Sequence, residues 1–283
     1  MEIIEGVTEM QKRSLALRAG GFKVVFVPTM GFLHDGHREL LRVGRERLGD
    51  KGALVLSIFV NPAQFGPKED YGSYPRDLGR DLKIAEEAGV DVVFTPKAGE
   101  VYPSGYKTYV EVMGLGDNLC GPLRPGHFKG VATVVLKLFN IVGPHAAIFG
   151  AKDYQQLQII KKMTLDLNLG IDIVGVETVR EPDGLAMSSR NAYLSPGERK
   201  QALCVPSALE SARLAFASGI RESSVLIEKM KKNIEKEPGA VVEYIKVCDK
   251  ESLVDLERIT KDALVAIAVR IGKARLIDNC ILS

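Results

Sequence analysis

The first 179 residues alternate short apolar runs with amphipathic stretches, and this alternation restricts the fold more than any other feature. The apolar runs are rich in β-branched residues and are expected to be strands, at 23–28, 53–60, 90–96, 146–150 and 171–179. The stretches between them are expected to be helices, at 35–48, 77–89, 130–144 and 153–167. Strands that are buried on both faces and joined through helices form parallel sheets. We therefore predict an α/β fold with a Rossmann-like, doubly wound parallel sheet.

The pattern changes after residue 179. A long helical stretch is expected at 194–219, where Ser195 suits the N-cap and Pro196 the first turn. A further helix is expected at 222–236, and strands at 240–248, 263–271 and 274–281, whereas one more strand, at 108–112, is expected in the first part of the chain. This second pattern predicts a smaller α+β domain at the C-terminus. The expected domains are residues 1–178 and 179–283, with a hinge in 180–191.

The composition excludes several classes of protein. Charged residues make up 26% of the chain and the net charge is only +2, which does not favour nucleic acid or an anionic membrane surface. No apolar run is long enough to span a bilayer. The four cysteines are far apart and form no CxxC pair, so a zinc site or redox motif is not expected. Scattered thiols without a secretory signal predict a cytoplasmic protein.

Polar residues follow several of the predicted strands, where ligands of parallel α/β sheets bind. They are Met30, Gly31, His34 and His37, then Asn61 and Gln64, then Lys152, Asp153 and Gln156, and finally Met187, Ser188, Ser189 and Arg190. Each group alone is a weak signal, because turns and helix caps use the same residue types. Their shared position at strand ends indicates one ligand site.

His34 and His37 lie at the expected start of a helix, where free N–H groups and the helix dipole favour anions. That dipole disfavours imidazolium, but a bound polyphosphate would reverse the bias. A metal site is a weaker interpretation, because the spacing differs from HExxH and no third His or Cys ligand is nearby. A surface turn with incidental histidines fits the spacing equally well.

The other groups have comparable alternatives. Lys152 offers a mobile charge for phosphate, or is a solvated loop lysine. The "MSSR" segment at 187–190 offers hydroxyls and a guanidinium for phosphate, or is a capping cluster. The amides of Asn61, Gln64 and Gln156 suit a small ligand with hydroxyl and carboxylate groups, or serve turns and caps.

The segment "RPGHFKG", residues 124–130, places two further polar side chains, Arg124 and His127, before a predicted helix. Val131, Val134 and Val135 share one face of that helix. Packing against the sheet is the default expectation for valines at this spacing.

Taken together, these segments resemble the pantothenate synthetase family (pantoate–β-alanine ligases). The resemblance is carried by "PTMGFLHDGH", "FVNPAQF", "YPRDLGRDL", "GPLRPGHFKGVATVV", "IFGAKDYQQLQII" and "REPDGLAMSSRN", which run in order from residue 28 to about 200. The family belongs to the HIGH-type nucleotidyltransferases, and "MSSR" resembles the KMSKS loop of the related synthetases. Ala151 departs from the Glu or Gln of many relatives, at a variable position.

The resemblance implies a set of site residues. ATP would be held by Met30, Gly31, His34, His37, Gly150, Lys152, Asp153, Val179, Met187, Ser188, Ser189 and Arg190. Pantoate and β-alanine would be held by Pro28, Met30, Asn61, Gln64, Val131, Val134, Val135 and Gln156. The residues expected to act in catalysis are His37 as proton donor, His34, Lys152 and Arg190. No protein metal ligand is implied, and Mg²⁺ would be carried mainly by the ATP phosphates.

The implied reaction activates pantoate as an adenylate and passes it to β-alanine, giving pantothenate, AMP and pyrophosphate. The resemblance also implies a homodimer with no nucleic-acid or membrane partner. A plain nucleotidylyltransferase would share the histidine pair without needing the three amides. A non-catalytic ATP-sensing module remains compatible if the pair is only a cap, whereas size and charge disfavour a tRNA synthetase.

Overall fold

The structure, a computed structural model, describes residues 1–49, 51–67 and 69–283. The chain forms two compact units. Unit 1 comprises Met1–Met113, Arg124–Ala151 and Gln156–Glu177. Unit 2 comprises Gly114–Leu123, Lys152–Gln155 and Thr178–Ser283.

Unit 1 is built on a six-stranded parallel sheet with the strand order β1-β4-β3-β2-β5-β6. Its strands are β1 (Glu2–Ile4), β2 (Lys23–Thr29), β3 (Gly52–Ile58), β4 (Val92–Phe94), β5 (Ala146–Gly150) and β6 (Asp172–Val176). The predicted Rossmann-like parallel sheet is therefore confirmed.

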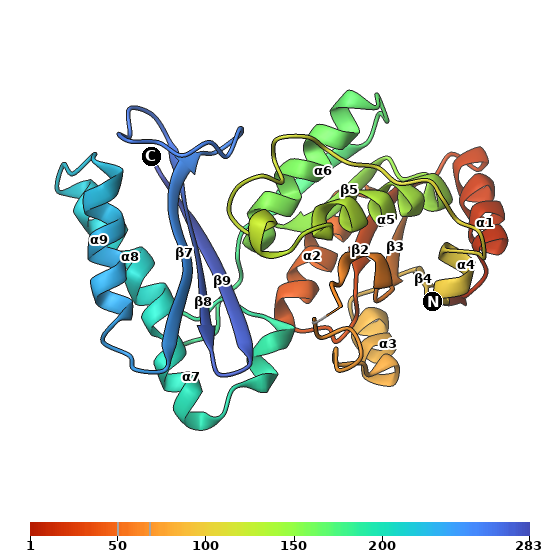
Figure 1. Cartoon of the computed structure of the whole chain (residues 1–283). Helices are drawn as coiled ribbons and strands as arrows, with labels where there is room; N and C mark the ends of the chain where they lie inside the picture. Colours follow the sequence, from red (N-terminus) through yellow and green to blue (C-terminus); the bar gives the residue numbers. More distant parts are fainter. Residues whose placement is uncertain (50, 68) are drawn as a thin grey trace. The chain divides into compact units, whose positions relative to one another are not determined.

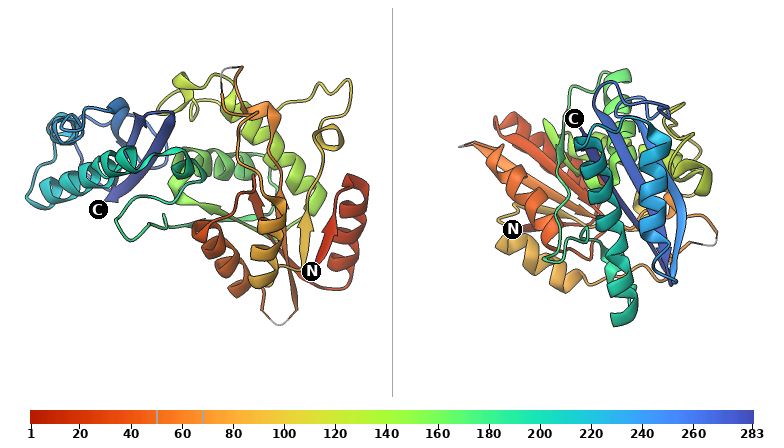
Figure 2. Two further views of the ribbon diagram at one scale, coloured as in Figure 1. Left: turned by 90° about the horizontal axis from the view of Figure 1, so that it is seen from below. Right: turned by 90° about the vertical axis from the view of Figure 1, so that its left-hand side faces the viewer.

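Helices cover both faces of this sheet (Figures 1 and 2). One face carries α1 (Val7–Ala19), α5 (His127–Val142) and α6 (Tyr154–Asp166), and the other carries α2 (Asp35–Glu46) and α3 (Leu78–Glu87). Val25 and Val27 of β2 pack in one core with Leu41 of α2. The ring of Phe26, between them, meets Phe139 of α5 edge-on at 6.5 Å. Burial on both faces explains why the strand is continuously apolar.

Unit 2 contains a three-stranded antiparallel sheet, β7 (Ala240–Asp249), β8 (Ala263–Ile271) and β9 (Ala274–Leu282), in the order β7-β8-β9. Its helices are α7 (Pro196–Ala202), α8 (Cys204–Ala217) and α9 (Ser223–Ile234). Leu209 of α8 and Met230 of α9 share a core with Val265 and Ile267 of β8. Ser195 caps α7 through a reciprocal bond pair with Glu198, as its position predicted.

The helical stretch predicted at 194–219 is interrupted, because α7 ends at Ala202 and α8 begins at Cys204. Pro206 accounts for the break. A proline has no N–H to bond the carbonyl four residues earlier, at Ala202, and its ring crowds that carbonyl. The prediction of one continuous helical stretch over 194–219 is therefore wrong, and two helices stand in its place.

The strand predicted at 108–112 is also wrong, since the residues there join no sheet. The main chain of Val110 instead bonds a side chain of α5. Its N–H donates to Thr133 Oγ1 at 2.9 Å, and the same hydroxyl donates to its carbonyl at 3.4 Å. The four-residue helix α4 (Ala98–Val101) precedes this segment. In the part of the chain that is described, no helix is long and apolar enough to cross a membrane.

Candidate functional site

The strand order reverses at the carboxyl edge of the parallel sheet, between β2 and β5. β2 lies between β3, which follows it in the chain, and β5, which is reached only after β4. Open α/β sheets bind ligands in the crevice at such a point. The segment after β2 carries both predicted histidines, and β5 ends at the predicted ATP residue Gly150. The sheet therefore brings these two segments to neighbouring strand ends.

The turn between β2 and α2 has an unusual backbone that a carboxylate supports. Gly31 and Phe32 have φ angles of +80° and +51°, in the left-handed region. The N–H groups of Phe32 and Leu33 each donate to the Asp81 carboxylate at 2.7 Å. A Cβ at position 31 would lie 2.8 Å from that carboxylate, so the turn requires glycine. Burial raises the pKa of Asp81, and the two hydrogen bonds oppose that rise.

His34 and His37 form a reciprocal cap at the start of α2. His34 is the N-cap, and its Nδ1 accepts from the N–H of Gly36 at 3.2 Å. The N–H of His34 donates to His37 Nδ1, also at 3.2 Å, and the two ring centroids lie 4.1 Å apart. This arrangement is a capping box made from two imidazoles.

The cap determines which nitrogens of the two rings can donate. Each Nδ1 accepts a backbone N–H, so each neutral imidazole carries its proton on Nε2. Two neighbouring Nε2–H groups suit phosphate oxygens. The N–H groups of Gly36 and His37 bond within the cap itself. The expectation that the helix start offers free N–H groups to an anion is therefore wrong for these two.

A buried amide pair follows β3, at the 3₁₀ turn η1 (Pro62–Gln64). Asn61 Nδ2 donates to Gln64 Oε1 at 3.0 Å and to the carbonyl of Gly130 at 3.1 Å. Asn61 Oδ1 accepts from the N–H of Ala63 at 3.2 Å. Gln64 Nε2 lies 3.2 Å from Met30 Sδ, a weak acceptor. Gln64 Oε1 therefore already accepts a hydrogen bond from Asn61, whereas among the described residues Gln64 Nε2–H has only a weak acceptor. The Nε2–H is the better placed of the two groups to bind a ligand.

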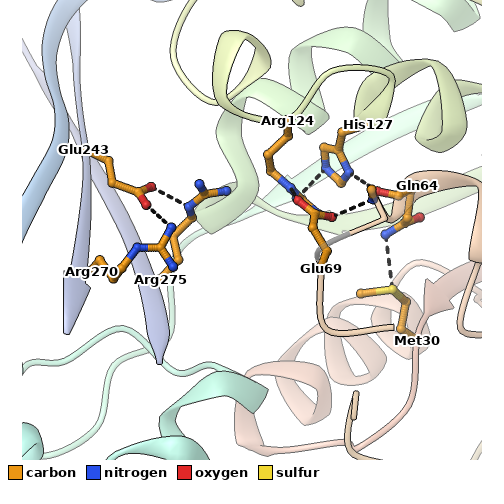
Figure 3. Close-up of polar contacts among 9 residues, drawn as sticks. Met30, Gln64, Glu69, Arg124, His127, Glu243, Arg270 and Arg275 are labelled. Carbon is orange, nitrogen blue, oxygen red and sulfur yellow. Dashed lines mark hydrogen bonds and ion pairs between the residues drawn. The ribbon is translucent and has the colours of Figure 1, made fainter. Parts of the chain in front are cut away.

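A chain of three side chains fastens the main chain of this loop to α5 (Figure 3). His127 Nδ1 donates to the Gln64 carbonyl at 2.8 Å, and its Nε2 accepts from Arg124 at 2.9 Å. Arg124 also makes a two-point ion pair with Glu69, at 2.6 and 2.7 Å. Burial would raise the pKa of Glu69, but the bonds from Arg124, together with smaller contributions that include the Gly66 N–H, lower it overall.

All the residues predicted to hold pantoate and β-alanine belong to unit 1. Val131, Val134 and Val135 are buried in α5. Pro28 in β2 and Gln156 in α6 are partly buried. The neighbouring Gln155 is buried instead, and its side chain bonds the main chain of Leu115, Asn118 and Cys120 within unit 2.

Most of the remaining predicted ATP residues belong to unit 2: Lys152, Asp153, Val179, Met187, Ser188, Ser189 and Arg190. Lys152 lies in the turn η3 (Ala151–Asp153), where its carbonyl accepts from Asn279 Nδ2 at 2.9 Å. Ser188 caps the turn η4 (Ser189–Tyr193), and its Oγ accepts from the N–H of Arg190 at 3.3 Å. The capping role considered for these serines is thus present for Ser188.

Ion pairs brace the segment 179–191 within unit 2. Arg180 makes two bonds to Asp278, whose side chain is fully buried, at 2.7 and 3.0 Å. Arg199 bonds both Glu181 and Asp183. The N–H of Met187 donates to the carbonyl of Val179 at 3.0 Å, which closes the segment into a hairpin.

Sequence reasoning missed Asp81, although a signal was present. Asp81 shares the buried face of α3 with Ile84 and Ala85. A carboxylate on the apolar face of an amphipathic helix requires a partner. Among the residues that the structure describes, no group of three His, Cys, Asp or Glu side chains is arranged to hold a metal ion.

Comparisons with known proteins cover the whole chain. The sequence profile of the family described as pantoate-beta-alanine ligase matches residues 2–281. The pantothenate synthetase of Syntrophotalea carbinolica is 54% identical over 279 residues, 99% of this chain and 98% of that protein. That of Geobacter sulfurreducens is 52% identical over 282 residues, 100% of this chain and 99% of the other.

Solved structures agree with these sequence relatives. The crystal structure of pantothenate synthetase from Thermus thermophilus superposes with a TM-score of 0.92 at 43% identity and covers 99% of both chains. The Francisella tularensis pantoate-beta-alanine ligase, complexed with beta-gamma ATP and beta-alanine, has a TM-score of 0.81 at 33% identity. That match covers 99% of this chain and 97% of the other.

Proposed function

The chain belongs to the pantoate–β-alanine ligase family, and from that premise we propose that it condenses pantoate with β-alanine at the expense of ATP. It is a ligase that forms a C–N bond and releases AMP and pyrophosphate. ATP is its substrate, as the complex of the Francisella relative supports.

The observation that carries this proposal is the donor that Gln64 offers beside Met30. Pantoate brings a carboxylate and a hydroxyl, both acceptors, and a donor held by a buried amide pair suits either. Met30 precedes His34 by four residues, so the same turn connects the amide pair to the histidine cap. A plain nucleotidylyltransferase does not need the amide pair.

In the first step, the pantoate carboxylate attacks the α-phosphorus of ATP and pyrophosphate leaves. Gln64 and Gln156 hold oxygens of pantoate, and Asn61 borders them. Val131, Val134 and Val135, with Pro28 and Met30, pack against its methyl groups. These residues orient the carboxylate, and orientation lowers the barrier because it replaces a bimolecular encounter.

Charge on the phosphates is stabilised by donors from two parts of the chain. His34 and His37 present Nε2–H groups, and His37 is the proposed proton donor. Met30, Gly31, Gly150, Asp153 and Val179 complete the ATP site, and Lys152 with residues 187–190 supplies further donors. Preorganised donors of this kind are usually the largest contribution to catalysis.

In the second step, the β-alanine amine attacks the activated carbonyl, the new C–N bond forms and AMP leaves. We place Gln64 close to β-alanine as well as to pantoate. A Mg²⁺ ion bound with ATP would supply positive charge to the triphosphate, since such ions bind mainly phosphate oxygens and water. The side chains proposed to bind the phosphates act there as hydrogen-bond donors and not as metal ligands. The carboxylate of Asp81 already accepts hydrogen bonds from two backbone N–H groups. No side chain is therefore assigned to the ion.

We further propose that residues 1–178 and 179–283 are functional domains and that the second closes over ATP through "MSSR". The resemblance of that segment to KMSKS supports closure, which would protect the adenylate from water. Small-angle scattering should show a more compact particle with ATP, and identical profiles would contradict closure. A homodimer in the cytoplasm is proposed from the family, and light scattering tests the dimer.

An AMP-release assay tests the function. AMP should appear only when ATP, pantoate and β-alanine are all present. ATP binding without pantoate-dependent AMP release would favour an ATP-sensing module. Retention of the nucleotide in the final product would favour a nucleotidylyltransferase.

A further inference from the structure

Asn61 is held by a residue from a distant part of the chain. Its Oδ1 accepts from the Ala63 N–H and also from Tyr102 Oη, at 2.8 Å. With the two bonds that its Nδ2 donates, the Asn61 amide makes four hydrogen bonds. The N–H of Ala63 can only donate and the carbonyl of Gly130 can only accept, so these two groups determine which end of the Asn61 amide is the oxygen and which is the nitrogen. The phenol then holds the amide in place.

Tyr102 is itself fixed by its neighbours. It lies directly after α4, and its ring meets that of Tyr106 edge-on at a centroid distance of 5.1 Å. Lys137 of α5 places its Nζ 4.4 Å from the Tyr106 ring and 5.7 Å from the Tyr102 ring, as cation–π pairs do. Burial raises the pKa of Tyr102 above its ordinary value, so the phenol stays protonated at neutral pH.

We propose that Tyr102 is a positioning residue for pantoate, acting through Asn61 on Gln64. Its hydroxyl tethers the Asn61 side chain, Asn61 engages Gln64 Oε1, and Gln64 Nε2–H is thereby directed at the substrate. This inference rests on the proposed function, because it takes Gln64 as a pantoate residue. Tyr102 therefore affects the binding of pantoate and leaves the binding of ATP unchanged.

The test compares Tyr102→Phe with Tyr106→Phe in the full-length protein. Both changes remove one hydroxyl from the same aromatic cluster, but among the described residues only the Tyr102 hydroxyl bonds Asn61. Loss of one hydrogen bond predicts a rise of about fivefold in the pantoate KM of Tyr102→Phe. The ATP KM should stay within about twofold, and Tyr106→Phe should leave both constants near those of the wild type.

A double-mutant cycle separates positioning from general destabilisation. If Tyr102 acts through Asn61, Tyr102→Phe should add nothing to the pantoate KM of Asn61→Ala. Independent effects of the two changes, or equal rises in the ATP and pantoate KM of Tyr102→Phe, would overturn the inference. So would a wild-type pantoate KM in Tyr102→Phe. A wild-type protein that releases no AMP from the three substrates would instead refute the proposed function.

Discussion

The amide pair of unit 1 and the 179–191 segment of unit 2 are held by different forces. Asn61 and Gln64 are 1% and 8% exposed and bond neutral groups. Arg199, which braces the segment, has a side chain 25% exposed and bonds two carboxylates that are still more exposed. Partly exposed ion pairs weaken with salt, whereas buried neutral hydrogen bonds do not. The comparison predicts that the amide pair, which we propose as part of the pantoate site, keeps its geometry as the salt concentration changes, whereas the Arg199 contacts to the 179–191 segment weaken with salt.

The largest effect should come from removing one proposed phosphate-binding group from each unit, His37 from unit 1 and Lys152 from unit 2. His37→Ala and Lys152→Ala should each lower the rate of adenylation by roughly 10²–10³, because each loses a group that stabilises developing charge. Rapid-quench measurement of pyrophosphate release checks this. Lys162→Ala, at an exposed i,i+4 pair on α6, is the control and should retain full activity. Near-normal rates in both site variants would refute the roles assigned.

The packing of the amide loop on α5 can be broken at one position. A Cβ at residue 130 would lie 2.2 Å from the carbonyl oxygen of Ala63 and 2.7 Å from Gln64 Cα. Gly130→Ala should therefore cost about 1–3 kcal/mol of unfolding free energy and raise the pantoate KM. Urea unfolding and steady-state kinetics measure the two effects.

Gly79→Ala, on helix α3, is the matched control, since the nearest side-chain atom that its Cβ would meet among the described residues is Asp77 Oδ1, at 3.9 Å. Alanine there should be neutral or slightly stabilising, because it favours the helix. If Gly130→Ala behaved like Gly79→Ala, the close approach of loop and helix would not matter for pantoate.

The Arg124–Glu69 pair should show a pH-dependent contribution to stability. Burial alone would raise the pKa of Glu69, but Arg124 lowers it, so the pair stabilises the fold above the ordinary pKa of a glutamate. Arg124→Gln should cost about 1–2 kcal/mol at neutral pH. That difference from wild type should shrink as the pH falls through about 4. Urea unfolding at both pH values checks it, and a difference that does not change with pH would contradict the assignment.

The smallest effect should come from the ion pairs of unit 2. Arg199→Gln should cost about 0.2–1 kcal/mol at low salt, and the cost should nearly vanish at about 1 M NaCl, where the Debye length is about 3 Å. The cost of Gly130→Ala should not change with salt. A salt-independent cost for Arg199→Gln would remove the distinction between the two regions.

The sequence predicted the elements whose pattern is local and regular. The strand at 146–150 and the strand at 263–271 have the predicted bounds, because the first is an apolar run throughout and the second is apolar except for Arg270. The strand β1 was not predicted, since three residues are too few for a period and its stability comes from pairing with β4. The 108–112 segment has β-branched residues, but the N–H and carbonyl of Val110 at its centre bond the Thr133 side chain of α5 instead of a neighbouring strand.

The sequence indicated candidate site residues where residue chemistry is unusual at a strand end, as for His34, His37 and Gln64, and their roles stay predictions. The partners that orient these groups were not. Asp81 lies 48 or more residues from the turn it supports, and Tyr102 lies 41 residues from Asn61. Such contacts depend on tertiary packing, which no local pattern encodes. The sequence also did not establish that His34 caps the start of α2, because that contact depends on the backbone geometry of the turn.

Oxygen transfer from pantoate tests the central claim most directly. If the pantoate carboxylate attacks the α-phosphorus and AMP then leaves the acyl group, pantoate labelled with ¹⁸O in its carboxylate should pass one labelled oxygen to AMP. Mass spectrometry of the AMP from a complete reaction measures this. Unlabelled AMP, with the label retained in pantothenate or released elsewhere, would contradict the adenylate route.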